Sequence, residues 1–258
     1  MSVEVLKYET RTRRAPVAAL TAALSLLTFG ALGAASGLES TVADLTEGFP
    51  EALMAFIPAD VPGGYVVGEV FNLIAPLMLV AYAVMAGASI VAGEEETGTM
   101  SVLASMPLTR RALLMSKAAG VAVSLVMIIS VFAAVTLTAE GIFDIGLTTS
   151  AVLATCLQLL LLGLFFGALG LAVGASTGNR QLASMVAGGL AAVAYLCETL
   201  LPLADLDALA RFSPWHYYSG TEPLAVGLDA TSVMVLSSLT AAALATALIG
   251  FEHRDLKD

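Results

Sequence analysis

The sequence is poor in charged residues. Only 12% of its 258 residues are Asp, Glu, Lys or Arg, whereas soluble globular domains carry about 25%. The mean hydropathy is +0.90, and 58% of the residues are hydrophobic. Because a charge in the core of a bilayer is costly, clustered charges between long uncharged runs indicate membrane-spanning segments. An ordinary soluble domain is therefore excluded.

Residues that carry catalysis or bind metals are also scarce. The chain has two cysteines, Cys156 and Cys197, and two histidines, His216 and His253, which make neither a disulfide framework nor a metal-binding pattern. None of its three lysines lies in a glycine-rich phosphate loop, and no serine lies in a GxSxG motif. We expect no catalytic residue, metal site or cofactor in this chain, and no enzymatic activity of its own.

Six uncharged or nearly uncharged runs are long enough to cross a bilayer, since about 20 helical residues span roughly 30 Å of hydrocarbon. The sequence predicts an all-α polytopic membrane protein with a single domain, 1–258. A cleaved secretory signal is the alternative for the first run, but that run is longer than a signal's apolar core. The fourth span is expected to begin at a cap on Thr149 or Ser150. The spans are expected at about 15–38, 70–93, 118–139, 150–176, 181–201 and 230–251.

Basic residues indicate the orientation of these spans. Ten of the eleven lysines and arginines lie in the two terminal segments or in the loops at 94–117 and 177–181, and only Arg211 lies in the opposite loops. By the positive-inside rule, the segments rich in basic residues face the cytoplasm. We expect both termini to be cytoplasmic in a multi-pass protein of the cell membrane.

Residues 1–14 combine basic and apolar side chains. Lys7, Arg11 and Arg14 fall on one helical stripe, which is typical of a short helix lying on the inner membrane surface. A frayed basic end that serves only to orient the protein is an equal alternative.

The insert at 94–117 is the longest charged segment on the cytoplasmic side. Its three glutamates are expected to continue the helix of the second span, Gly98 to break it, Pro107 to end a short apolar helix, and Thr109 to cap the third span. An apolar edge with charged flanks suits a groove on a partner protein. Alternatively, the charges mark the membrane edge and the apolar positions lie on lipid. The candidate partner-binding residues are Glu94, Glu95, Glu96, Thr97, Gly98, Thr99, Met100, Leu103, Pro107, Arg110 and Arg111.

The order of residues in this insert resembles the permease subunits of type-2 ATP-binding-cassette exporters. In that family a glutamate precedes Gly-Thr-Leu/Met, a further leucine, and Pro-Leu/Val-Ser/Thr-Arg. The resemblance extends over the chain, through a basic start, six spans, a glycine-rich fourth span and a bulky segment between the last two spans. The matching positions are Glu94 or Glu95, Gly98, Thr99, Met100, Leu103, Pro107, Leu108, Thr109 and Arg110.

The resemblance implies a membrane subunit that forms half of a translocation pathway. A coupling helix at about 97–107 would dock on a separate ATP-binding-cassette ATPase, which would bind ATP and Mg. A second permease copy, in a homo- or heterodimer, and membrane lipid are the other expected partners, and no nucleic acid is expected. Spans without buried charge favour a hydrophobic or amphipathic substrate, or lipid. A non-transporting scaffold or regulatory subunit that recruits an ATPase, and a channel or carrier acting alone, remain as alternatives.

The fourth span carries a ridge of four glycines and one lone amide. Gly163, Gly167, Gly170 and Gly174 share one helix face, and small residues let helices approach closely in lipid. Packing within the chain is the expected use, with a dimer contact or a moving seam as alternatives. Gln158 is expected to make a hydrogen bond between helices, with substrate contact as its alternative.

Aromatic residues gather in the external segment 203–229. Phe212, Trp215, Tyr217 and Tyr218 lie within seven residues of one another. Because Trp and Tyr prefer the headgroup level, a belt at the membrane surface is the first interpretation. In the resembling permeases, short helices at this position re-enter the membrane and form an external gate, which implies that these four residues are gate candidates.

Overall fold

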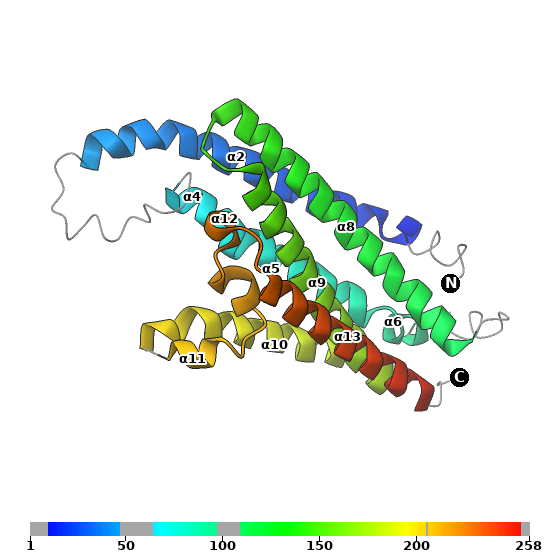
Figure 1. Ribbon diagram of the computed structural model, residues 1–258. Coiled ribbons are helices and arrows are strands. Elements are labelled where there is room, and N and C mark those ends of the chain that lie inside the picture. The colour runs from blue at the N-terminus through cyan, green and yellow to red at the C-terminus, as the bar shows by residue number, and fades with distance from the viewer. Residues whose placement is uncertain (1–9, 47–63, 97–108, 205, 254–258) are drawn as a thin grey trace.

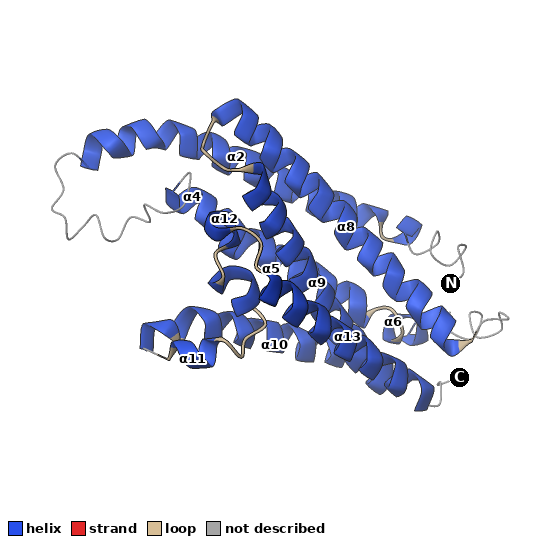
Figure 2. Ribbon diagram, in the orientation of Figure 1, coloured by secondary structure: helices blue, strands red, loops and turns tan. Residues whose placement is uncertain are grey.

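The computed structural model describes residues 10–46, 64–96, 109–204 and 206–253. Within these ranges every regular element is helical and there is no strand (Figure 2). Six helices have the length and composition to cross a membrane, so the prediction of an all-α protein with six spans is confirmed. These candidate spans are Arg14–Gly37, Val67–Ala88, Arg110–Phe143, Thr149–Thr177, Arg180–Leu200 and Ala230–His253.

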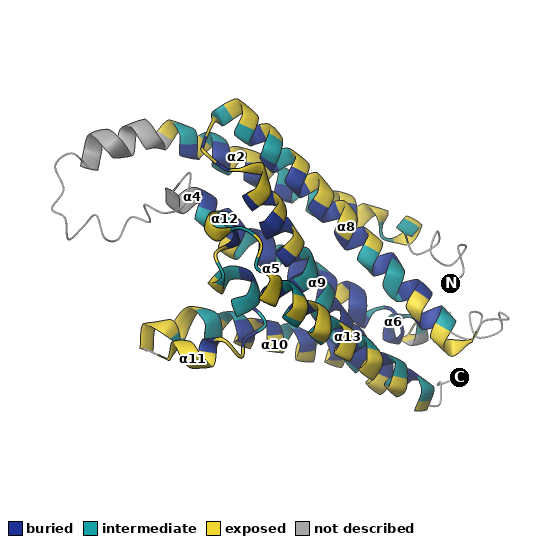
Figure 3. Ribbon diagram, in the orientation of Figure 1, coloured by how far each residue is buried: buried dark blue, intermediate teal, exposed yellow. Residues whose placement is uncertain are grey.

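Helix α9 lies at the centre of the bundle (Figure 1). It contacts α5, α8, α10 and α13, whereas α2 packs mainly on α8 at one side. Buried residues concentrate on α5 and α9 (Figure 3). The elements are α2 (Arg14–Thr46), α4 (Gly64–Glu69), the π-helix η1 (Val70–Ile74), α5 (Ala75–Ala88), α6 (Ala92–Glu96), α8 (Arg110–Phe143), α9 (Thr149–Thr177), α10 (Arg180–Leu200), the 3₁₀ turn η2 (Pro202–Ala204), α11 (Asp207–Ala210), the π-helix η3 (His216–Gly220), α12 (Pro223–Val226) and α13 (Ala230–His253).

The first helix is longer than the sequence predicted. It continues to Thr46, eight residues past the expected end at Leu38. No glycine or proline lies between Leu38 and Thr46 to stop it. Helix α8, which forms the third span, also extends beyond the expected range 118–139. It begins at Arg110 and ends at Phe143.

The second span ends earlier than predicted. Helix α5 stops at Ala88, and a turn at 89–91 separates it from α6. The Ser89 hydroxyl donates to the carbonyl of Ala86 at 2.8 Å, and the Arg13 guanidinium donates to the same carbonyl at 3.4 Å. Side chains thus satisfy a carbonyl near the helix end. The expectation that the three glutamates continue the span is therefore wrong, since they belong to the separate helix α6.

Polar side chains cap the helices that begin at the ends of the bundle. Thr109 caps α8 as predicted, because its hydroxyl accepts the N–H three residues on at 3.2 Å. Helix α9 is capped by Thr148 at 3.3 Å, not by Thr149 or Ser150. At α13, the Asp229 carboxylate accepts both the N–H and the hydroxyl of Ser232, at 2.6 and 2.7 Å. These hydrogen bonds lower the pKa of Asp229.

The four-glycine ridge of α9 lies against α5 within the same chain. A Cβ on Gly170 would lie 2.9 Å from the carbonyl oxygen of Val84, and one on Gly174 would lie 3.1 Å from that of Ala88. The closest approach involves a residue that the sequence analysis missed, since a Cβ on Gly87 would overlap the carbonyl oxygen of Gly167. The two helices therefore touch through their backbones.

The substitution Gly87→Ala tests this contact. We expect it to destabilise the protein by about 1–3 kcal/mol, because the added methyl group meets backbone that can move only with its whole helix. The measurement is the thermal unfolding midpoint in detergent. Gly189→Ala on α10 is the matched control, since no atom beyond its own stretch of helix lies within 4 Å of the position of its Cβ. Equal midpoints for the two variants would contradict backbone contact between α5 and α9.

Candidate functional site

The candidate site is the end of the bundle where the 94–117 segment joins the spans. The first residues of α2 and α8 and the last residues of α6 and α13 lie at this end (Figure 1). Six of the predicted partner-binding residues lie outside the described residues, and their role stays a prediction: Thr97, Gly98, Thr99, Met100, Leu103 and Pro107.

Lys117 closes the base of this segment. Its side chain is only 2% exposed, and its ammonium group forms an ion pair with the carboxylate of Glu94 on α6. A buried charge that loses its counter-charge is strongly destabilising, so this pair holds the two ends of the segment together. From its sequence, Lys117 is expected in a polar loop, and the helices are expected to hold no buried charge. That expectation is wrong, because α8 already begins at Arg110 and carries Lys117 onto its buried face.

Arg111 joins the start of α8 to the end of α13. Its Nη2 donates to Glu252 Oε2 at 2.9 Å, and its Nε donates to Oε1 of the same carboxylate. The pair is bidentate, which fixes its geometry. Because the Arg111 side chain is 72% exposed, solvent screens the pair and it contributes little to stability. It positions the helix ends more than it stabilises them.

Arg13 brings the N-terminal segment to the same end. Its guanidinium donates to the carbonyl of Ala86 and to the hydroxyl of Ser89, both at 3.4 Å. A cation at a helix C-terminus is favoured by the helix dipole. The basic stripe predicted from the sequence contains Lys7, Arg11 and Arg14, whereas the contact is made by Arg13, which lies outside that stripe. Of the predicted surface helix, only the part from residue 10 onward is described.

The segment between α10 and α13 occupies the opposite end of the bundle. Phe212 is 84% exposed, Tyr217 is half-buried, and Trp215 and Tyr218 are almost fully buried. The Trp215 ring packs on aromatic rings of α9 and α10 at centroid distances of 6.0 and 5.3 Å. A belt of rings at the membrane surface is therefore the wrong interpretation for Trp215 and Tyr218, because these two rings are buried inside the protein.

Tyr218 donates a hydrogen bond to a backbone carbonyl that has no donor within the helix of span two. In the π-helix η1, the N–H of Ala75 bonds to the carbonyl of Val70. The next bond of that pattern would join Phe71 to Pro76, and proline has no N–H. The Tyr218 hydroxyl donates to the Phe71 carbonyl instead. Burial raises the pKa of Tyr218 well above its usual value, so the phenol keeps the proton that it donates.

Two further contacts attach this segment to the spans. The Gln158 amide of α9 donates to the hydroxyl of Thr221 at 3.4 Å, so its partner lies on the connecting segment and not on another span. His216 Nδ1 lies 3.2 Å from both carboxylate oxygens of Glu198 on α10. The connecting segment thus contacts three spans through polar groups.

Among the described residues, the side chains that could bind a metal ion lie apart from one another. Cys156 and Cys197 are both free. In the part of the chain that the structure describes, no three His, Cys, Asp or Glu side chains gather as a metal site requires. At the 94–117 end, the described contacts join α6 to α8, α8 to α13, and the start of α2 to the end of α5.

Disruption of the buried ion pair should reduce stability. We expect Lys117→Met alone to cost about 3–5 kcal/mol, because it leaves the partly buried Glu94 carboxylate without its counter-charge. Adding Glu94→Gln should recover a large part of the loss. The thermal midpoints of the wild type, both single variants and the double variant measure the coupling between the two residues. Additive effects would show that the pair does not couple.

Replacement of the buried phenol tests the link at the other end. Tyr218→Phe keeps the ring and removes the donor, which leaves the Phe71 carbonyl without its hydrogen bond. We expect a loss of about 1–3 kcal/mol in stability. Tyr217→Phe is the matched control, since Tyr217 is the half-buried neighbour. A midpoint for Tyr218→Phe equal to that of the control would contradict this role.

Comparison with known proteins agrees with this architecture. Residues 5–256 match the family described as ABC-2 family transporter protein. No curated protein matches the sequence. The match covers nearly the whole chain, including all six candidate spans, and supports the role of a transport permease that partners with an ATP-binding-cassette ATPase. This multi-pass membrane protein belongs to the ABC-2 family of transporters.

Proposed function

We propose that this chain is the membrane subunit of an ATP-driven exporter of the cytoplasmic membrane. It forms half of the translocation pathway together with a second permease copy. A separate ATP-binding-cassette ATPase binds ATP and Mg and docks on the 94–117 segment. The observation that carries the proposal is the buried pair of Glu94 and Lys117 at the base of that segment.

The ion pair makes the base of the segment a mechanical connection. Movement of a docked ATPase displaces the segment, and the pair passes this displacement to α6 and α8 together. The contacts of Arg13 with Ala86 and Ser89 brace the adjoining end of α5. A simple connecting loop needs only a few residues and no buried charge.

Helix α5 carries the displacement toward the opposite end of the bundle. Its backbone contact with α9 at Gly87 and Gly167 leaves little freedom for independent motion, because packed interiors are dense. At its other end, α5 continues from the π-helix that Tyr218 contacts. Energy from ATP hydrolysis thus has a continuous packed route to the segment 203–229, the external gate in this proposal.

Basic residues support the orientation of the exporter. Arg13, Arg111 and Lys117 all belong to the end that holds the 94–117 segment. By the positive-inside rule this end faces the cytoplasm, where the ATPase obtains ATP. The apolar character of the spans favours a hydrophobic or amphipathic substrate.

Substitution in the proposed coupling segment tests this function. We expect Glu95→Lys combined with Gly98→Pro to leave membrane insertion intact and to abolish stimulation of the partner ATPase, because the charge is reversed and the hairpin backbone is altered. The measurement is ATP hydrolysis by the reconstituted complex with and without substrate.

Asp207→Lys is the control, since it reverses one charge on α11 at the opposite end of the bundle. Unchanged stimulation in the double variant would place the ATPase contact elsewhere. Binding of the ATPase without ATP-dependent movement of substrate would identify a scaffold and refute export.

A further inference from the structure

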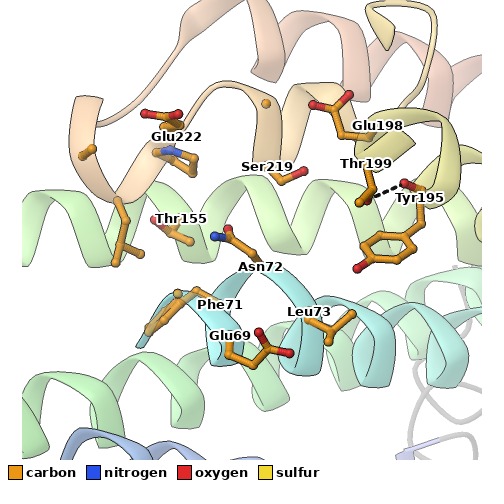
Figure 4. A pocket seen from close by; sticks show the side chains of 15 residues that line it. Glu69, Phe71, Asn72, Leu73, Thr155, Tyr195, Glu198, Thr199, Ser219 and Glu222 are labelled. Carbon is orange, nitrogen blue, oxygen red and sulfur yellow. Dashed lines mark hydrogen bonds between the residues drawn. The ribbon is translucent and has the colours of Figure 1, made fainter. Parts of the chain in front are cut away.

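A cavity of about 700 Å³ lies at the end of the bundle opposite the 94–117 segment. Its walls come from η1 and α4 on one side, from α9 at its floor, and from α10 and the connecting segment on the other (Figure 4). Asn72 projects from η1 toward Ser219 of the connecting segment (Figure 4). The volume lies within the range of about 300–1,000 Å³ that is typical of sites for small organic molecules.

The walls offer apolar and aromatic surface to such a molecule. Phe71 of η1 and Tyr195 of α10 line the cavity, together with Leu73 and Leu224. Thr155, buried on α9, lies at its floor, and its hydroxyl donates to the helix backbone. A ligand that fills this space therefore needs apolar surface. Aromatic rings also attract cations through their faces.

The charged groups on the walls are all carboxylates. Glu69 of α4, Glu198 of α10 and Glu222 before α12 line the cavity, and no lysine or arginine is among its described lining residues. Glu198 is paired with His216, so Glu69 and Glu222 are the carboxylates left to act on a ligand. The negative charge of these two carboxylates, on separate walls, favours a cation and repels an anion.

The spacing of the carboxylates indicates a large cation. They come from three separate elements, and the described residues contain no group of three acidic or other ligating side chains close enough to share a metal ion. A metal ion would need such a group. A lipophilic organic cation, with its charge spread over or surrounded by apolar groups, satisfies both the apolar walls and the separated carboxylates.

We propose that this cavity binds lipophilic organic monocations, such as quaternary ammonium or phosphonium amphiphiles. The proposal rests on the function proposed above, and it names the chemical class of the transported substrate. The cation sits between η1 and the connecting segment, where the Tyr218 contact joins the same two elements. Opening of this contact releases the cation on the outer side.

A pair of probes with equal shape and opposite charge tests the proposal. Tetraphenylphosphonium and tetraphenylborate carry the same four phenyl groups on a cationic and an anionic centre. Binding of each labelled probe to the full chain in nanodiscs is measured by equilibrium dialysis, with empty nanodiscs subtracted. Trp215, the only tryptophan in the chain, lies 5.3 Å from the cavity residue Tyr195, so its fluorescence reports occupancy.

We expect saturable binding of the phosphonium that changes Trp215 fluorescence, and no saturable binding of the borate. Glu69→Gln and Glu222→Gln should each weaken phosphonium binding about fivefold or more, because each removes a charge close to the ligand. Asp207→Asn, which removes an exposed acid that does not line the cavity, should leave binding unchanged.

Equal binding of both probes, or wild-type phosphonium affinity in both glutamate variants, would overturn the assignment. An equal loss in Asp207→Asn would also overturn it, because the effect would then come from net surface charge. The binding assay contains no ATPase. Failure of phosphonium binding alongside normal ATPase stimulation refutes only the cation site, whereas normal binding without ATP-driven transport refutes only the export function.

Discussion

The backbone contact between α5 and α9 is the constraint on which the rest of the structure depends. In lipid, helices gain little from burial of apolar surface against one another and associate through close packing. Gly87 and Gly167 allow that packing, because no side chain separates the two backbones. Since α9 also contacts α8, α10 and α13, fixing α5 on α9 fixes the centre of the whole bundle.

Polar contacts are concentrated at the two ends of this packed pair. At one end, the buried pair of Glu94 and Lys117 and the braces from Arg13 hold the base of the 94–117 segment. At the other end, Tyr218 holds the connecting segment against η1. Apolar packing between these ends resists independent motion of α5. The two ends of the bundle are therefore linked through a packed helix pair, and the proposed coupling uses this link.

The sequence was informative wherever a local rule applied. Uncharged runs located all six spans, and Thr109 was identified as a cap because it follows Pro107 and precedes the third span. Local rules failed where a distant residue decided the outcome. The end of α5 depends on Arg13, 73 residues away, and the burial of Tyr218 depends on a carbonyl 147 residues away. Pro76 was a local signal that the Phe71 carbonyl lacks a donor in its own helix, although nothing in the sequence identified Tyr218 as the partner.

By itself, the sequence determined that the chain is a six-span helical membrane protein, because the hydropathy and the length of each uncharged run depend only on residues that are neighbours in the sequence. It also marked 94–117 as a distinctive segment by the order of its charges and breaks. Only the tertiary structure decided that Lys117 pairs with Glu94 inside the protein, that Gly87 faces the glycine ridge, and that three glutamates surround one cavity. These are contacts between helices. Their geometry depends on the angle at which two helices cross and on how each helix is rotated about its own axis, and no local sequence pattern encodes either.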